Sequence, residues 1–314
     1  MGNARAKSAG EELALVSGRL GTLNLVGAGG VGRTLGLLWA KAGVFEIQDV
    51  LARSRESASA AVKTIGGGHA VSTQDEMRPA DAWLIATPDD AIAGACTMLA
   101  RSGRLKKGDV VFHLSGATPS EVLEPARRCG AHVASVHPIK TFTDPGAAAR
   151  TFAGTYCGVE GDAQALRMLR PAFEEIGARL LEIAPEMKGI YHAAGVFSCN
   201  YLAALIEAAL QCHEKAGIPR KVSLEAIEPM VRETVDAVLS RGPARALTGP
   251  IARGDVATVA RQLETLAAWK GDLAHLYCGL GLLAIKLAEA DRRLDSARAA
   301  DLRRVLSAEG TEGR

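Results

Sequence analysis

The sequence predicts an α/β protein in which a doubly wound parallel sheet is followed by an all-helical C-terminal domain. In the first half, short apolar runs alternate with helical stretches, which is typical of βαβ units and a parallel sheet. This alternation ends after about Gly161, and from Glu186 onward only helical periodicity is present. We therefore expect four parts: a flexible arm (1–20), an α/β domain (21–184), a helical domain (185–308) and a short tail (309–314).

The expected elements of the first half follow one another in regular order. We expect strands at 23–26, 45–52, 82–86, 109–114 and 132–136, with a last edge strand at 179–183. We expect helices at 31–42, 57–64 and 163–176, and a further helix that begins on an aspartate cap at Asp89 or Asp90. Glycine and proline near 217–219 and 242–243 are expected to separate the helices of the second half.

Composition excludes several functional classes. Lys plus Arg is 37 and Asp plus Glu is 35, so a net charge of +2 gives no electrostatic footprint for nucleic acid. Six scattered cysteines form no Cys-x-x-Cys pair, so neither a metal site nor a redox motif is expected. The longest weakly charged stretch, 189–206, contains His192 and Asn200, and we interpret it as a buried helix rather than a membrane span. We expect a cytoplasmic protein without a membrane partner.

A glycine-rich turn follows the first expected strand and opens the first expected helix. It consists of Gly27, Ala28, Gly29, Gly30, Val31 and Gly32. In this context the pattern Gly-x-Gly-x-x-Gly predicts dinucleotide binding, because the glycines allow a tight turn and a close approach of the pyrophosphate. The N-terminus of the helix offers unpaired N–H groups to the phosphates. The alternative is a glycine-rich turn in another kind of α/β protein.

The end of the second expected strand distinguishes NAD from NADP. An NAD-binding protein carries an acid there, about 20 residues beyond the turn. This sequence has Arg53, Ser54 and Arg55 instead, and two guanidinium groups with a hydroxyl suit a phosphate dianion. The prediction is NADP(H), with solvated surface arginines as the alternative.

Three polar clusters follow later strands, where ligands bind in open α/β sheets. Thr87 and Pro88 are expected beside the nicotinamide ribose, although the two following acids also fit a helix cap. Ser115, before Gly116, is a candidate hydrogen-bond donor to a substrate, or part of a plain turn. His137 precedes a proline and is a candidate proton donor, although a lone histidine is more often structural.

The helix after Pro185 carries further candidates. Lys188 and His192 are four residues apart and share one helical face, and Asn200 flanks the same face. A cation and an imidazole on an apolar helix need partners, which a filled cleft would provide. The alternatives are an exposed first-turn lysine and a satisfied core histidine.

A loop between two later helices, 246–255, combines a hydroxyl, a guanidinium and a carboxylate. Loops of this composition often serve sites. We expect Thr248 to contact a substrate and Arg253 to bind its carboxylate or to pair with Asp255. The alternative is a purely structural loop.

Together these motifs resemble a family of Rossmann-like NADP-binding proteins with a C-terminal helical domain of unknown function, distantly similar to ketopantoate reductase and pyrroline-5-carboxylate reductase. The resemblance rests on the motifs already described together with a few neighbours: the glycine turn, Arg53-Ser54-Arg55, Pro88-Asp89-Asp90, Ser115-Gly116, His137-Pro138 with Phe142, Tyr191-His192, Asn200, and the loop at 247–255. It implies an NADP-binding reductase. Lys188 matches the catalytic lysine of ketopantoate reductases in position, but His192 stands where the simplest match needs asparagine.

The leading hypothesis is hydride transfer from NADPH to a small carbonyl or imine compound that bears a carboxylate. His192, Lys188 or His137 would donate the proton, while Asn200 and Ser115 would position the carbonyl. The alternative hypothesis is a non-catalytic NADP(H)-binding sensor that acts through a partner. Because related reductases bury such apolar helices between subunits, we also expect a homodimer.

Overall fold

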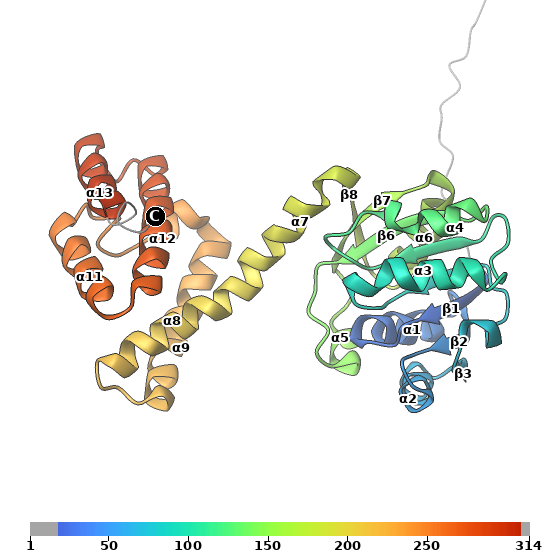
Figure 1. The fold of residues 1–314 in the computed structure, drawn as a ribbon. Coiled ribbons are helices and arrows are strands. Elements are labelled where there is room, and N and C mark those ends of the chain that lie inside the picture. The colour runs from blue at the N-terminus through green and yellow to red at the C-terminus, as the bar shows by residue number, and fades with distance from the viewer. Residues whose placement is uncertain (1–17, 309–314) are drawn as a thin grey trace, which may run out of the picture. The chain divides into compact units, whose positions relative to one another are not determined.

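The computed structural model describes residues 18–308 and divides the chain into two compact units, Met1–Cys199 and Asn200–Arg314 (Figure 1). Most of the arm expected at 1–20, and all of the tail expected at 309–314, lie outside the described residues. The strands of the first unit are β1 (Thr22–Val26), β2 (Glu46–Leu51), β3 (His69–Val71), β4 (Ala82–Ile85), β5 (Val110–His113), β6 (His132–Pro138), β7 (Tyr156–Gly161) and β8 (Arg179–Glu182). Its helices are α1 (Gly30–Ala42), α2 (Arg55–Ile65), α3 (Ile92–Arg101), α4 (Glu124–Arg128), α5 (Pro145–Arg150), α6 (Ala163–Glu175) and α7 (Lys188–Gly195), with short 3-10 turns η1 (Gln74–Glu76), η2 (Asp89–Ala91), η3 (Ser120–Leu123) and η4 (Pro185–Met187).

The eight strands form one sheet in the order β3-β2-β1-β4-β5-β6-β7-β8. The pairs from β3 to β6 are parallel, as the alternation of strands and helices predicted. β7 runs antiparallel to β6, and β8 runs parallel to β7. The sequence reading missed β3 and β7, and the direction of β7 differs from the all-parallel expectation. The direction of a strand depends on where the preceding connection crosses the sheet, and no local sequence pattern predicts this.

Two apolar layers cover the sheet. On one face, α1, α2 and α6 bury a cluster that includes Leu35, Trp39 and Phe173. On the other face, α3 and α4 bury a cluster that includes Ile92, Leu99 and Ala126. Because both faces are covered, the parallel strands are buried runs, as this type of sheet requires. The carboxyl ends of β1, β2, β4 and β5 are therefore left as the edge where a ligand can reach the backbone.

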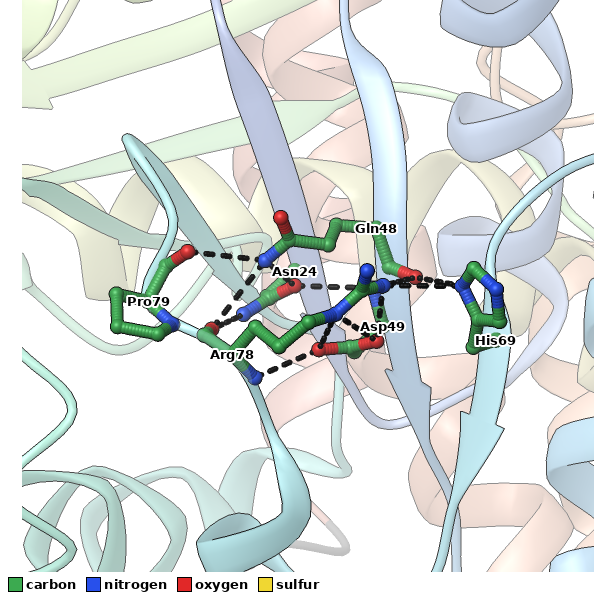
Figure 2. A network of polar contacts seen from close by, with 6 residues as sticks. All are labelled: Asn24, Gln48, Asp49, His69, Arg78 and Pro79. Atoms are coloured by element: carbon green, nitrogen blue, oxygen red, sulfur yellow. Dashed lines mark hydrogen bonds and ion pairs between the residues drawn. The ribbon is translucent and has the colours of Figure 1, made fainter.

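A network of polar side chains fixes the loop before β4 against β1, β2 and β3 (Figure 2). The Asp49 carboxylate, whose side chain is 2% exposed, accepts hydrogen bonds from the backbone N–H and the Nη2 of Arg78, both at 2.7 Å. The Arg78 carbonyl accepts from Asn24 Nδ2 at 2.6 Å and from Gln48 Nε2 at 3.3 Å. Arg78 Nη2 also lies 2.9 Å from His69 Nδ1. Each of these side chains has a partner, so the network serves stability.

The second unit is entirely helical within the described residues. A π-helical turn, η5 (Val196–Asn200), joins α7 to α8, and the helices are α8 (Tyr201–Lys215), α9 (Arg220–Arg241), α10 (Pro243–Ala246), α11 (Val256–Trp269), α12 (Gly271–Ala290) and α13 (Ser296–Ala308). The helix breaks fall where the sequence predicted them. α11, α12 and α13 enclose a core that includes Leu263, Ile285 and Leu302.

The apolar stretch at 189–206 was expected to be buried, and within the single chain this expectation is wrong. It belongs to the helical segment Pro185–Lys215, of which only 6% is buried in its most apolar window. The first residue of α7, Lys188, is buried, but Ile190, two residues later, is 68% exposed. By length and composition this segment and α12 could each cross a membrane, but α12 contributes to the helical core, and the cytoplasmic location stays a prediction.

Candidate functional site

The glycine turn lies where the sequence predicted it, between β1 and α1. Gly27 has a φ of +101°, and a Cβ there would lie 2.6 Å from the backbone of Ala86, at the end of β4. Gly32 packs closely as well, because a Cβ would lie 2.9 Å from the Ala86 side chain. A Cβ on Gly30 would collide with the Phe142 carbonyl. These three glycines are thus required by the fold itself.

Gly29 is different, because nothing in the fold requires a glycine there. Its φ is −73°, which any residue adopts, and a Cβ would meet only the Ala86 carbonyl at 4.0 Å. It is exposed and precedes the first turn of α1, which has neither a side-chain cap nor an acidic residue. A backbone left bare beside an uncapped helix N-terminus is the arrangement that binds phosphate groups.

Arg53, Ser54 and Arg55 follow β2 directly, beside the glycine turn. Gly27 N–H donates to the Leu51 carbonyl at 2.8 Å, which fixes the end of β2 against the turn. Ser54 caps α2 by accepting from Ser57 N–H at 3.2 Å. Both arginines are exposed, and neither forms an ion pair with another residue in the described part of the chain. Two unpaired guanidinium groups at this position leave a concentrated positive charge.

Sequence reasoning missed Arg33, which follows the last glycine of the motif. Its Nε donates to the Ala28 carbonyl at 2.7 Å, and its Nη2 lies 3.5 Å from the Ser57 carbonyl. Arg33 therefore braces the turn and adds a third cation near the start of α2. An arginine directly after a glycine motif is a signal that the sequence offered.

Thr87 and Pro88 lie at the end of β4, facing the glycine turn through Ala86. Thr87 Oγ1 is buried and has no hydrogen-bond partner among the described residues. Asp89 does not cap a helix as one interpretation proposed, because its Oδ2 accepts the Ser115 hydroxyl at 2.6 Å. Ser115 Oγ in turn accepts from Thr118 N–H at 2.9 Å. The ends of β4 and β5 are thus joined by side chains, and Thr87 is left with unused bonding capacity.

Lys188 is buried rather than exposed. Its Nζ donates to the Ser115 carbonyl at 2.8 Å and to Ser135 Oγ at 2.6 Å, and it lies 3.8 Å from Glu160 Oε1. Glu160, also buried, accepts both the N–H and the hydroxyl of Ser120. Burial lowers the pKa of Lys188, and the nearby carboxylate of Glu160 opposes this shift. Two hydrogen bonds and one ion pair thus engage the ammonium group, and the lysine holds the end of β5 in place. Glu160 was not predicted, because its pairing spans distant segments.

His137 and His192 meet beside Gly116, and the Tyr191 hydroxyl contacts His137 from beside Gly158. The His137 and His192 rings meet edge to face with centroids 5.5 Å apart, and His137 Nδ1 lies 3.0 Å from the Tyr191 hydroxyl. A Cβ on Gly116 would lie 2.8 Å from His137 Nε2 and would collide with His192 Nδ1. His192 Nδ1 is buried without a hydrogen-bond partner among the described residues. Two imidazoles thus converge where Gly116 lacks a side chain.

Burial sets the protonation of this cluster. It lowers the pKa of His137 to about 4, with His192 and Lys188 adding to the shift, so the ring is neutral near pH 7. It also lowers the pKa of His113, behind Ser115, to about 4. Burial raises the pKa of Tyr191 to about 12, so its phenol keeps its proton. His137 and Tyr191 therefore both act as uncharged hydrogen-bonding groups near pH 7.

The remaining predicted residues belong to the second unit. Asn200 ends the π-helical turn η5, and such turns often mark functional sites. Thr248 and Arg253 are exposed on the loop before α11. Asp255 caps α11 by accepting from Thr258 N–H at 3.1 Å. Arg293 and Arg298 donate to carbonyls of this loop, which supports its structural role. The substrate-binding roles of Thr248 and Arg253 stay predictions.

Comparison with protein families identifies two domains in the chain. A Rossmann-like domain matches residues 7–138, and a domain of unknown function (DUF2520) matches residues 155–283. The chain therefore combines these two domains, and the resemblance stated from its motifs is confirmed. No curated protein matched the sequence.

Solved structures share the fold over most of the chain. A protein from Thermotoga maritima is 26% identical, with a TM-score of 0.69 over 86% of this chain and 100% of that one. A Bacteroides fragilis protein, provisionally described as an NADP oxidoreductase, is 22% identical, with a TM-score of 0.68 over 85% and 98%. Pyrroline carboxylate reductase from Plasmodium falciparum, solved with NADP bound, is 15% identical, with a TM-score of 0.54 over 87% and 99%.

Proposed function

We propose that the protein is an NADP(H)-dependent oxidoreductase that transfers hydride to a small carbonyl or imine compound bearing a carboxylate. One observation carries this proposal. Three buried side-chain atoms lack partners within residues 18–308, and two of them, Thr87 Oγ1 and His192 Nδ1, lie on the strand-end edge that begins at the glycine turn. Because buried polar groups are normally paired, unpaired ones at such an edge favour a ligand that completes them.

The residues of this edge fit NADP(H). The bare backbone at Gly29 and the uncapped start of α1 suit the pyrophosphate, and Arg53 with Arg55 suits the 2′-phosphate. Thr87 Oγ1 supplies a hydroxyl at the end of β4. The Plasmodium falciparum structure of the same fold holds NADP, which supports this assignment. Bound there, the nicotinamide would supply the hydride.

The proton is assigned to the histidine cluster. Lys188 donates two hydrogen bonds, to Ser115 and Ser135, and pairs with Glu160, so its proposed role is to position the loop at Ser115. His137 and His192 retain nitrogens that bond no described residue, so one of them faces the substrate. A neutral donor suits a carbonyl substrate in particular, because the carbonyl oxygen becomes strongly basic only as hydride arrives.

The experiment is a turnover assay of the purified full chain with NADPH against a panel of 2-oxo acids and cyclic imines, followed by loss of NADPH absorbance. Reduction of one class, abolished by His192→Leu with NADPH binding retained, supports the enzyme. Tight NADPH binding without turnover on any substrate contradicts it. That outcome would favour the alternative of an NADP(H) sensor acting through a partner.

We also propose that two copies of the chain form a homodimer through the second unit. A groove of about 590 Å³ between α8 and α9 is lined by five apolar and three charged residues: Ile206, Leu224, Ile227, Val231 and Val235, with Glu228, Arg232 and Asp236. On the same helices Met230 is 61% and Leu239 is 80% exposed. Exposed apolar side chains gathered on one pair of helices are typical of a protein–protein interface, which supports the proposal. Light scattering coupled to size-exclusion chromatography should give twice the chain mass, and a stable monomer would contradict the proposal.

A further inference from the structure

We propose that Tyr191 and His137 form a proton relay that ends at His137 Nε2 and protonates the oxygen of a carbonyl substrate. The inference rests on the proposed function and narrows its substrate class from carbonyl or imine to carbonyl. It is carried by the hydrogen bond between Tyr191 and His137, by the second contact of the phenol, and by the free nitrogen on the far side of the His137 ring.

The geometry decides which atom holds each proton. The Tyr191 oxygen lies 3.0 Å from His137 Nδ1 and 3.4 Å from the His137 carbonyl. Gly158, on β7, lies directly beside this phenol, because a Cβ there would come within 2.7 Å of the phenol oxygen. A phenol has one proton, and we assign it to the nearer of its two acceptors, Nδ1 at 3.0 Å, rather than to the carbonyl at 3.4 Å. The His137 imidazole is then in the tautomer that carries its proton on Nε2.

His137 Nε2 is the open end of the relay. It makes no hydrogen bond with any residue in the described part of the chain, and it faces Gly116 together with His192 Nδ1. Alanine at position 116 would place a methyl group against both rings. A donor at Nε2 and an unpaired nitrogen at His192 can therefore hold the same oxygen-bearing group of a substrate.

The charged groups around the cluster leave the imidazole neutral. Desolvation is the largest cause of the lowered pKa of His137; His192 and Lys188 lower it further, and Asp89 opposes them. The phenol likewise stays protonated, because burial raises the pKa of Tyr191 to about 12. Neither group works by adding or losing charge before the reaction. Both are placed to pass one proton from the Tyr191 phenol through the His137 ring toward the substrate.

The relay balances for a carbonyl. When hydride adds to the carbonyl carbon, the π electron pair of the C=O bond moves to oxygen. The oxygen takes the Nε2 proton, Nδ1 takes the phenolic proton, and the phenolate regains a proton from water. An alkoxide is a much stronger base than a phenolate, so the transfer runs downhill. An iminium ion already carries its proton on nitrogen, and its reduction needs no relay.

The first test reads the tautomer directly and needs no substrate. Long-range proton–nitrogen correlation spectra of the full chain with labelled histidine should find His137 protonated at Nε2 alone. In Tyr191→Phe the same ring should become a mixture of both tautomers. Tyr277→Phe is the matched control, because Tyr277 donates to Gln262 at 2.8 Å in the other unit, and it should leave His137 unchanged. A proton on Nδ1 in the wild type, or no change in Tyr191→Phe, overturns the relay.

The second test separates the relay from the proposed function. Tyr191→Phe should slow carbonyl reduction by about 100-fold or more, leave NADPH affinity unchanged, and spare the reduction of any preformed iminium ion. An equal loss on both substrates, or a wild type that reduces only imines, overturns the relay. A wild type that reduces neither class overturns the proposed function, while the tautomer spectra still decide whether Tyr191 directs the His137 proton.

Discussion

The first unit contains two polar clusters with buried members that differ in how completely those members are paired. The network around Asp49 and Arg78 pairs its side chains with one another and with backbone groups (Figure 2). The cluster at the ends of β4, β5 and β6 leaves Thr87 Oγ1 and His192 Nδ1 without a partner. Both clusters stand on the same sheet and draw on similar residue types. The difference teaches that burial of polar groups alone does not mark a site, whereas incomplete pairing at the strand ends does.

Acid pH should have the largest effect, and it acts on the strand-end cluster. The pKa values of His113 and His137 are lowered from 6.5 to about 4. The unfolded chain therefore binds protons at a higher pH than the folded one. The free energy of unfolding should be at its full value above pH 6.5. Between pH 6.5 and 4 it should fall by about 3 kcal/mol per histidine. Urea unfolding at a series of pH values measures this.

A His113→Gln variant provides the control for the pH series. Removing one of the two titrating groups should flatten the slope of stability against pH across this interval by about half. A wild-type stability that rises as the pH falls from 6.5 to 4 would contradict the proposed burial of neutral imidazoles.

Asp49→Ala should break the paired network. The substitution removes the acceptor of the Arg78 backbone N–H and guanidinium, so the free energy of unfolding should fall by about 2 kcal/mol. NADPH affinity should stay unchanged. Arg19→Ala is the matched control, because the Arg19–Glu46 pair is 56% exposed on both sides and its loss should cost under about 0.5 kcal/mol. If Asp49→Ala kept its stability but lost NADPH binding, the Asp49 network would belong to the binding site, which would contradict the assignment of roles to the two clusters.

His192→Leu should have the opposite and smallest effect on stability. It replaces an unpaired buried nitrogen by carbon, so unfolding in the absence of ligand should become harder by about 1 kcal/mol or stay unchanged. His213→Leu gives the comparison, because His213 Nδ1 lies 2.6 Å from Ser223 Oγ and its loss should destabilise the second unit. Equal destabilisation by both variants would mean that His192 is a satisfied structural histidine.

Much of the fold could be predicted from the sequence, because its signals are local. The strand–turn–helix at Gly27–Gly32 and the arginines after β2 combine short-range patterns with known backbone consequences. β3 was missed because it has only three residues, and β7 because Tyr156–Gly161 contains two glycines and few apolar residues.

The site was only partly predictable, because its contacts span distant segments. The sequence placed Lys188 and His192 on one helical face, but it did not reveal that Glu160 and Ser135 would enclose the lysine. Tyr191 was noticed as part of a motif, while its bond to His137 depends on how α7 meets β6. Asp89 was interpreted as a possible helix cap. The structure shows instead that it accepts a hydrogen bond from Ser115, 26 residues away, which no local pattern could predict.

The central claim is that the strand-end edge binds NADP(H), and calorimetric titration of the full chain tests it most directly. The account predicts that NADPH binds at least about 100-fold more tightly than NADH, because Arg53 and Arg55 contact the extra phosphate. In Arg53→Ala/Arg55→Ala the two affinities should become equal, while Arg241→Ala should leave them unchanged. Equal affinity for both nucleotides in the wild type, or binding of neither, would contradict the account.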